Sequence, residues 1–530
     1  MEIHKLQQLL SEMSLQEKIG QMVQLTGVYF DKEAVLTGVV GEQLPPEWVI
    51  QYAGSVLGVI GKEKICDIQS KYMEQHPHHI PLLFMADVIH GCRTIFPIPL
   101  GQACSFHPEL VSEAASIAAS EASSEGLKAT FSPMIDVSRD PRWGRMLESF
   151  GEDPYVNGVM GEAMVDGYQQ KNDEGIAACL KHFAGYGAVN AGREYNDVEI
   201  SQRTFLEQYV KPFRMALKAK PAMVMTAFNA IDRKPISGNK ELLRELLRDK
   251  EGFDGTVISD WGSIGQLAAD MDEAAVQAIE AGVDIDMMSP AYMFRLEELV
   301  KNGQIPESFI DESAFRVLMM KNQLGLFENP FAGLGKSGKL TLYNRTKAYQ
   351  MASESCVLLK NEEILPLCQR QKVIWAGPYV TSKEFLSRWA IFGEHEPVET
   401  IEAILQDKKM NAECIPGCRM LSEEECKIWQ VEQDDSDEEI DEQWLETITR
   451  EDTVVCVLGE HESQSGEAAS RAFLTLPEEQ QMLFEKIAKR TDNIVTVVIS
   501  GRPLDLRRIS EKSKAVIMAW RPGTMGAEAI

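Results

Sequence analysis

The sequence predicts an α/β protein in which an N-terminal (β/α)8-type barrel is followed by an αβ-sandwich domain. Short, nearly continuous apolar runs alternate with helical segments over the first 290 residues, as buried parallel strands separated by helices do. A glycine-rich stretch at 329–345 interrupts this pattern, and a second series of apolar runs follows it. With 530 residues, the chain has the length of two or three domains.

The barrel strands are predicted from seven apolar runs separated by helical segments. This repeat fits a closed barrel better than an open sheet, although periodicity alone is compatible with both. The first 25 residues are interpreted as helices, with Ser14 and Glu17 placed as a capping box. The predicted strands are 55–61, 81–88, 129–137, 176–183, 222–229, 255–261 and 283–288.

The second domain is predicted as a doubly wound α/β unit with a helix at 476–490. Its acidic run at 434–443 is interpreted as a solvated loop or helix face. Because the chain stops at Ile530 where a helix begins, we expect this domain to be incomplete at its C-terminus. We place the barrel at 1–330, a linker at 331–345 and the second domain at 346–530, with strands at 357–360, 372–378, 453–460, 493–500 and 515–520.

The composition excludes several classes of function. The 53 Lys and Arg residues against 81 Asp and Glu residues give a net charge of −28, which disfavours nucleic acid as a partner. No apolar run approaches the ~18 residues of a membrane span, and the first residues lack the pattern of a secretion signal. The ten cysteines are scattered and suit buried thiols in a reducing compartment. We therefore expect a cytoplasmic protein that binds neither nucleic acid nor membrane.

Polar and charged residues end most of the predicted barrel strands. Buried strands have no structural need for so many charges at one end. In a barrel of parallel strands the C-terminal strand ends carry the active site, so these residues are the first candidates. They are Asp87, Asp136, Lys181, His182, Asn229, Asp260 and Asp286.

Some of these residue types suit work on a sugar. The Asp260 carboxylate can stabilise an oxocarbenium-like centre while the Trp261 indole packs on the ring; a helix N-cap is the alternative for Asp260. Lys181 and His182 offer charged donors to hydroxyl groups, or else form a salt bridge and a buried core histidine. Asp87 can bind two sugar hydroxyl groups at once; the alternative is that it caps a loop.

Further candidates lie outside the strand ends. Arg145, in an arginine-rich segment at 136–154, can bind vicinal hydroxyls or hold a carboxylate in place. In the second domain Glu460, Glu462 and Glu467 follow a predicted strand and are candidate acids. On composition alone, a surface position is the simpler interpretation of each glutamate.

No metal and no cofactor is predicted. His76, His78 and His79 share a proline-interrupted loop, for which an exposed position is a better interpretation than a metal site. The loop at 459–468 lacks the glycine-rich turn and the lysine of a phosphate-binding loop. The α/β pattern of the second domain therefore does not imply a nucleotide.

Several motifs, taken together and in order, resemble glycoside hydrolase family 3, the β-glucosidase group. They run along the whole chain, and the arginine-rich block with the KHF and SDW motifs makes a chance match improbable. The resemblance implies a barrel followed by an αβ sandwich, and often a fibronectin type III-like domain, which would lie beyond residue 530. The motifs are MADVIHG, FSPMIDVSRDPRWGRMLESFGEDP, CLKHFAGYG, VMTAFNA, VISDWG, AGVDIDMM and SGRPLDL.

By this resemblance, Asp260 is the nucleophile and Glu467 the general acid/base of a retaining glycosidase, with Glu460 as the fallback acid. The chemistry suggests that a neighbouring basic side chain lowers the pKa of Asp260, and that a negative neighbour in a closed cleft raises the pKa of Glu467. Many family members carry Tyr where this sequence has Phe228. Positions that hold the sugar in the first subsite match Asp87, Arg145, Lys181 and His182, and positions that wall or reach it match Met225, Trp261 and Trp389.

The activity that the resemblance implies is exo-acting hydrolysis of terminal, non-reducing β-D-glucose from a small carbohydrate substrate. A β-xylosidase or an α-arabinofuranosidase of the same fold stays open, as does a catalytically silent carbohydrate-binding protein. β-N-acetylglucosaminidases of the family carry a second histidine in a KHFPGHG-like motif; this sequence has KHFAGYG, with Tyr186 in its place, which argues against that activity. The oligomeric state is open, with a homodimer as one candidate.

Overall fold

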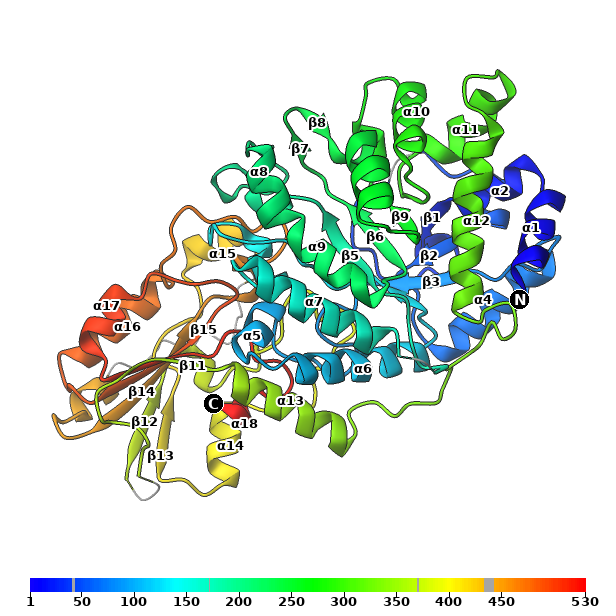
Figure 1. Cartoon of the computed structure of the whole chain (residues 1–530). Coiled ribbons are helices and arrows are strands. Elements are labelled where there is room, and N and C mark those ends of the chain that lie inside the picture. Colours follow the sequence, from blue (N-terminus) through cyan, green and yellow to red (C-terminus); the bar gives the residue numbers. More distant parts are fainter. Residues whose placement is uncertain (41–42, 171, 369–370, 433–442) are drawn as a thin grey trace.

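A computed structural model of the chain describes residues 1–40, 43–170, 172–368, 371–432 and 443–530. The predicted acidic loop at 434–443 therefore lies, apart from Gln443, outside the described residues. Figure 1 shows two parts: a barrel built from the first part of the chain and an open sheet built from the last part.

Eight parallel strands of the described residues close into a barrel, which confirms the predicted fold class. One sheet has the order β10-β1-β2-β3-β4 and a second the order β5-β6-β9. Parallel bridges between Ala129 and Ala177 and between Ile258 and Ile285 join the two sheets, so every strand has a neighbour on both sides. The strands are β1 (Val23–Thr26), β2 (Ser55–Leu57), β3 (Leu83–Ala86), β4 (Ala129–Thr130), β5 (Cys179–Phe183), β6 (Met223–Thr226), β9 (Thr256–Ile258) and β10 (Asp286–Met287).

Strand β1 lies in the segment that we predict as helix, and this part of the prediction is wrong. The Ser14–Glu17 capping box is present, with backbone-to-side-chain distances of 2.8 and 3.3 Å, and α2 begins as predicted. However, α2 ends at Gln21 and the chain enters β1 at Val23. All residues of β1 are buried, and they pair with β2 and β10. A four-residue segment carries too little periodicity to distinguish strand from helix, so pairing on both sides determines its structure.

Helices surround the barrel (Figure 1). Helices α1 and α2 pack against α12, and α6, α7 and α9 pack in succession. None of the described helices combines the length and the apolar character that a membrane crossing needs. The helices of this part are α1 (Ile3–Glu12), α2 (Leu15–Gln21), α3 (Glu47–Tyr52), α4 (Lys62–Gln75), α5 (Pro99–Cys104), α6 (Pro108–Ser124), α7 (Pro154–Tyr168), α8 (Gln202–Thr204), α9 (Lys211–Ala216), α10 (Met271–Ala281), α11 (Ala291–Lys301) and α12 (Glu307–Gln323).

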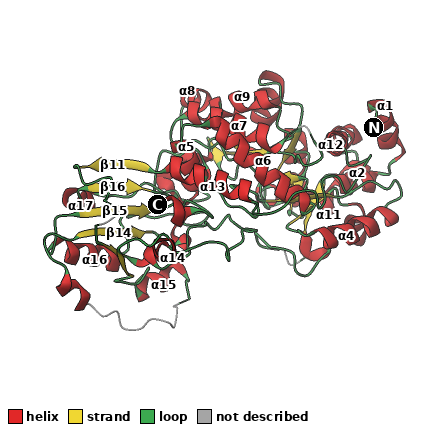
Figure 2. Ribbon diagram, turned by 90° about the horizontal axis from the view of Figure 1, so that it is seen from below, coloured by secondary structure: helices red, strands yellow, loops and turns green. Residues whose placement is uncertain are grey.

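The second part is a sheet with the order β11-β16-β15-β14-β12-β13, parallel except for β11, which runs antiparallel to β16. Figure 2 shows β11, β16, β15 and β14 side by side. Alternate residues of β14 point to opposite faces. Val454 shares a hydrophobic cluster with Leu483 of α16, and Val455 shares another with Leu405 of α14. Helices thus cover both faces, and the sheet is the centre of the predicted sandwich.

The predicted strands of this sheet are present, and β13 is an additional one. Its residues are only half-buried at the sheet edge, so it lacks the apolar run that reveals a central strand. Helix α13 starts at Leu342, inside the predicted linker; the predicted domain boundaries stay a prediction. The elements are β11 (Val357–Asn361), β12 (Val373–Ala376), β13 (Ala412–Ile415), β14 (Thr453–Gly459), β15 (Ile494–Ile499), β16 (Ala515–Met518), α13 (Leu342–Ser355), α14 (Ile401–Asp407), α15 (Glu423–Trp429), α16 (Glu478–Ala488), α17 (Arg507–Lys512) and α18 (Gly526–Ala529).

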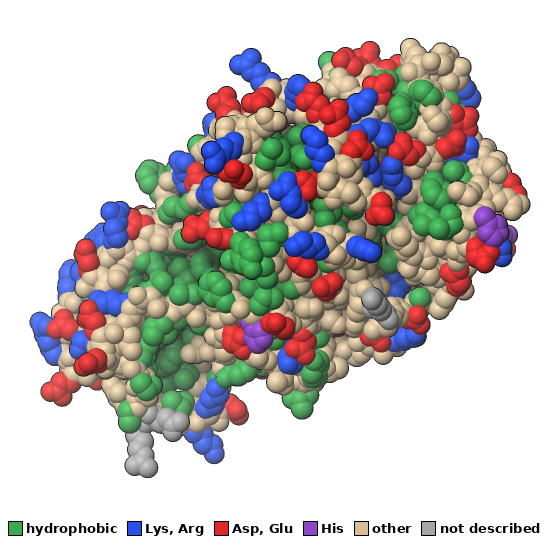
Figure 3. All heavy atoms as spheres, in the orientation of Figure 1, with side chains coloured by type: hydrophobic (Ala, Val, Ile, Leu, Met, Phe, Trp, Pro, Cys, Tyr) green, Lys and Arg blue, Asp and Glu red, His purple; other side chains and the backbone are tan. Residues whose placement is uncertain are grey.

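The face of the molecule seen in Figure 3 mixes charges of both signs over the barrel. Hydrophobic side chains gather on the same face over β11, whose Leu358 and Leu359 are 56% and 55% exposed. On this face acidic and basic side chains therefore lie interspersed over the barrel.

Candidate active site

One cavity of about 710 Å³ collects all the side chains that the family resemblance assigns to the first subsite and to the catalytic pair, whereas the other candidates, Asp136, Asn229, Asp286, Glu460 and Glu462, do not line it. It lies at the C-terminal ends of the barrel strands: Asp87 follows β3, Lys181 and His182 lie in β5, and Asp260 follows β9. Loops of the second part reach over from the other side. The predicted residues that line the cavity are Asp87, Arg145, Lys181, His182, Met225, Asp260, Trp261, Trp389 and Glu467.

Asp260 is buried at the base of this arrangement, with 7% of its surface exposed. Its Oδ1 accepts a hydrogen bond of 2.7 Å from the backbone N–H of Trp261. Its Oδ2 is buried without a hydrogen-bond partner among the described residues and lies 3.5 Å from Nε2 of His182. Burial raises the pKa of Asp260 to about 7, although the positive charge of Arg145 opposes this. One carboxylate oxygen is thus held by the backbone, and the other makes no hydrogen bond to the described residues.

His182 is oriented by Asp136, which the sequence predicts only as a charged residue at a strand end. Asp136 Oδ2 lies 2.8 Å from His182 Nδ1 and accepts the His182 backbone N–H at 2.9 Å. Burial, reinforced by the charges of Arg145 and Lys181, holds the pKa of His182 well below its ordinary value. We assign the proton of the neutral ring to Nδ1, facing Asp136, so that Nε2 presents a lone pair.

Arg145 connects the two halves of the site. Its guanidinium forms a paired contact with Glu148, at 2.9 and 3.0 Å, which fixes its plane. From this position Nη2 lies 3.3 Å from His182 Nε2 and Nη1 lies 3.6 Å from Glu467 Oε1. A continuous series of contacts therefore runs from Asp260 through His182 and Arg145 to Glu467.

Lys181 and Asp87 form a second charged pair, with 3.4 Å between Nζ and Oδ1. Burial raises the pKa of Asp87, although Lys181 opposes the shift. The Lys181 ammonium also lies 5.4 Å from the ring centre of Trp389, within cation–π range. Trp389 therefore does reach the pocket from the second part of the chain.

Glu467 lies on the loop that follows β14, and its side chain is 28% exposed. Its Oε1 accepts a hydrogen bond of 2.7 Å from the phenol of Tyr195. Burial by itself would raise the pKa of Glu467, but Arg145, this hydrogen bond and Lys181 together lower it. Tyr195 was not predicted, and no residue pattern points to it. Its φ of +60°, rare for a bulky side chain, is visible only in the fold.

The pKa directions of the two carboxylates are opposite to those that we expect from the sequence, and this expectation is wrong. Asp260 is the more deeply buried of the two, and its pKa is raised. The described ion pair of Arg145 at the cavity is with Glu467, 3.6 Å from Nη1, and not with Asp260. The pKa of Glu467 is accordingly lowered. Which carboxylate meets the arginine is a matter of tertiary structure.

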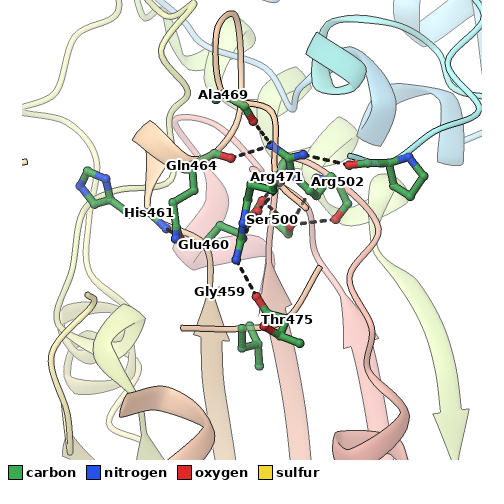
Figure 4. A network of polar contacts seen from close by, with 12 residues as sticks. Gly459, Glu460, His461, Gln464, Ala469, Arg471, Thr475, Ser500 and Arg502 are labelled. Carbon is green, nitrogen blue, oxygen red and sulfur yellow. Dashed lines mark hydrogen bonds and ion pairs between the residues drawn. The ribbon is translucent and has the colours of Figure 1, made fainter. Parts of the chain in front are cut away.

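The fallback acid, Glu460, does not line the cavity. It is fully buried and lies 2.6 Å from Nη1 of Arg471 and 3.1 Å from Nε of Arg502. It also accepts a hydrogen bond of 2.8 Å from Ser500 Oγ (Figure 4). Because its carboxylate is engaged in this network, Glu460 has a structural role. Glu467 is the glutamate that lines the cavity.

Two aromatic walls have neighbours that the sequence does not predict. Trp261 Nε1 donates a hydrogen bond of 2.9 Å to the Val39 carbonyl, and Gly38 packs so tightly on the indole that a Cβ would lie 2.4 Å from it. Phe228 lines the cavity with its ring centre 5.2 Å from that of Tyr195. Phe228 has no hydroxyl group, but the neighbouring Tyr195 has one, which contacts Glu467. In the described ranges no group of three or more His, Cys, Asp or Glu side chains is arranged to hold a metal ion.

Comparison with known proteins assigns the chain to a family. Residues 14–320 match the "Glycosyl hydrolase family 3 N terminal domain" and residues 356–530 the "Glycosyl hydrolase family 3 C-terminal domain". The "Periplasmic beta-glucosidase" of Salmonella typhimurium is 34% identical over 98% of this chain and 71% of that protein. A "Putative beta-xylosidase" of Formosa agariphila is 32% identical over the same shares.

A solved structure is similar throughout. The β-glucosidase of Listeria innocua, in crystals with isofagomine and with glucose, superposes with TM-scores of 0.91 and 0.90 at 39% identity. The match covers 100% of this chain and 74% of that one. Family match, sequence identity and fold agree, and the chain belongs to glycoside hydrolase family 3.

Proposed function

We propose that this glycoside hydrolase is a retaining, exo-acting β-glycosidase that releases terminal, non-reducing β-D-glucose from oligosaccharides or β-glucosides. The observation that carries the proposal is the convergence of Asp260 and Glu467, from separate parts of the chain, on one cavity. The β-glucosidases among its relatives, one of them solved with glucose, support the choice of sugar.

In the first step, the Asp260 carboxylate attacks the anomeric carbon while the bond from that carbon to the leaving oxygen breaks. Glu467 donates its proton to the departing oxygen. The Asp260 oxygen without a hydrogen bond is suited to form the ester of the glycosyl-enzyme. The active form therefore has Asp260 ionised and Glu467 protonated, and the pair shares its protons as a coupled system.

In the second step, water attacks the same carbon and Glu467 accepts its proton. The bond to Asp260 breaks, the carboxylate is restored, and the sugar leaves with its original anomeric configuration. Arg145, 3.6 Å from Glu467, favours the ionised form that Glu467 has at the start of this step.

Polar side chains around the pair are suited to recognise the hydroxyl groups of one sugar. Lys181 donates, Asp87 accepts, and the neutral His182 accepts through Nε2 when its proton is on Nδ1. Because all three are buried, their hydrogen bonds to a substrate form in a site shielded from water, where they discriminate strongly against a missing hydroxyl.

A β-xylosidase is the second candidate, because a relative named for that activity is 32% identical over nearly the whole chain. Xylose lacks the hydroxymethyl group of glucose. The p-nitrophenyl derivatives of β-glucose, β-xylose and α-L-arabinofuranose, compared by kcat/KM, separate the activities. We expect the β-glucoside to be preferred; a preference for either pentoside would replace the proposed substrate.

A mechanism-based label tests the chemistry. A 2,4-dinitrophenyl 2-deoxy-2-fluoro-β-glucoside traps the glycosyl-enzyme, and we expect peptide mapping to find the sugar on Asp260. Labelling of another residue would overturn the assignment. Sugar binding by calorimetry without turnover would instead identify a silent carbohydrate-binding protein. The cytoplasmic location stays a prediction, which cell fractionation tests.

A further inference from the structure

A single buried arginine, Arg502, holds the loop that carries Glu467. Arg502 is fully buried, and its Nη2 donates hydrogen bonds of 2.6 and 2.8 Å to the carbonyls of Gln464 and Ala469 (Figure 4). These two carbonyls lie on either side of Glu467 in the sequence. The arginine therefore ties together both ends of the turn from which the Glu467 side chain extends.

The other end of the same guanidinium reaches the loop before Arg145. Its Nη1 donates to the carbonyls of Pro141 and Arg142, at 2.9 and 3.0 Å. The two loops are also joined directly, since the backbone N–H of Gly466 donates to the Gly144 carbonyl at 2.8 Å. The Arg502 side chain therefore bridges the loop of Glu467 and the loop of Arg145, alongside this backbone hydrogen bond.

Glu460 fixes the orientation of this arginine. Its carboxylate lies 3.1 Å from Arg502 Nε and is itself held by Arg471 and Ser500. A buried ion pair is weak evidence for a contribution to stability. A planar fork that satisfies four backbone carbonyls is, however, a specific geometric device, and a lysine cannot reproduce it.

We propose that Arg502, oriented by Glu460, is a positioning residue that places Glu467 against Arg145 and thereby sets proton donation to the leaving group. This inference rests on the proposed function, since it requires Glu467 to be the acid/base. A displacement of about 1 Å in a reacting group can cost about 10²-fold in rate, so loosening this loop acts on the acid step even when the fold survives.

The test is the dependence of rate on the leaving group in the Arg502→Lys variant. Glucosides with poor leaving groups, such as methyl β-glucoside, need a proton from the acid before the leaving group can depart. The dinitrophenolate of 2,4-dinitrophenyl β-glucoside departs without this proton. We expect a loss of kcat/KM of about 10²-fold on the former and little change on the latter. Glu467→Ala, measured in parallel, defines the full loss of acid assistance.

Arg248→Lys is the matched control. Arg248 also has a mostly buried side chain, 8% exposed, which lies 2.7 Å from Asp284 and donates a hydrogen bond of 2.9 Å to the carbonyl of Gly255. Unlike Arg502, it lies before β9, at the barrel end opposite the cavity. We expect it to lower the melting temperature without changing the ratio of rates on the two substrates. An equal loss on both substrates in Arg502→Lys would overturn the positioning role.

A milder variant guards against misfolding. Glu460→Gln keeps the size of the Glu460 side chain but removes the charge that lies 3.1 Å from Arg502 Nε, so it weakens the orientation of Arg502 and leaves Arg502 itself in place. If Arg502→Lys does not fold, Glu460→Gln decides: a selective loss on the poor leaving group supports the inference and an unchanged ratio overturns it. If Glu467→Ala itself shows no such selectivity, the proposed function fails instead.

Discussion

The two carboxylates of the proposed pair are held in different ways. Asp260 follows a barrel strand, is 7% exposed and has one oxygen fixed by the adjacent backbone. Glu467 lies on a loop of the second part, has a side chain that is 28% exposed, and depends on Tyr195 and on the contacts of Arg502. The barrel fold itself places the proposed nucleophile, whereas the proposed acid/base is placed by contacts between loops that are far apart in sequence. Changes at the two sites should therefore differ in kind.

The largest effect is expected at the strand end. Asp260→Asn removes the attacking carboxylate, so both chemical steps stop, and we expect kcat to fall by at least about 10⁴-fold on substrates with good and poor leaving groups alike. Hydrolysis of 2,4-dinitrophenyl β-glucoside measures it. Asp286→Asn is the control, because Asp286 is also buried at a strand end but accepts hydrogen bonds from Ser289 and Tyr292. Near-normal activity in Asp260→Asn would contradict the assignment.

A smaller and selective effect is expected at the loop. Glu467→Ala removes proton transfer, which contributes about 10²–10⁴-fold, and leaves space for a small anion. We expect azide to restore the rate on an activated substrate and to yield β-glucosyl azide, identified by NMR. Glu462→Ala, on the same loop but not lining the cavity, should show no such rescue. The absence of azide product in Glu467→Ala would remove Glu467 from the role.

The electrostatic link between the two sites gives a pH test. The 2-fluoroglucoside with a dinitrophenyl leaving group needs only ionised Asp260, so its labelling rate should rise with pH through about 7, the pKa to which burial raises Asp260. The negative charge of Glu467 also raises the pKa of Asp260. Glu467→Gln removes that charge and should shift the midpoint to lower pH. A midpoint that stays or moves upward would show that the two carboxylates do not interact.

The same contrast explains what the sequence could predict. Asp87, Lys181, His182 and Asp260 end apolar runs, and barrel geometry gathers strand ends at one face, so the pattern alone identifies them. Glu467 follows no such rule and is identified only through the family resemblance. Most strands of both parts, and the helices between them, were likewise predictable from periodicity.

What was missed depends on contacts between distant segments. Tyr195 is far from Glu467 in sequence. The role of Asp136 in orienting His182 becomes clear only when the fold brings the two side chains together. Strand β1 is too short to be distinguished from helix without its neighbours. The pKa directions were wrong because burial and the position of Arg145 are consequences of the fold.

The smallest effect is expected from removing the hydrogen bond between Tyr195 and Glu467, which tests whether the pKa of Glu467 depends on contacts between loops. Tyr195→Phe removes the phenol hydrogen bond of 2.7 Å but keeps the ring against Phe228. A hydrogen bond of this kind contributes about 1 kcal/mol net, or about fivefold in rate. Because the bond stabilises the carboxylate and lowers the pKa of Glu467, its loss should raise that pKa and move the corresponding limb of the kcat/KM profile to higher pH. A purely structural tyrosine would lower the melting temperature without moving the limb, and in that case the charges of Arg145 and Lys181, without the hydrogen bond, lower the pKa of Glu467.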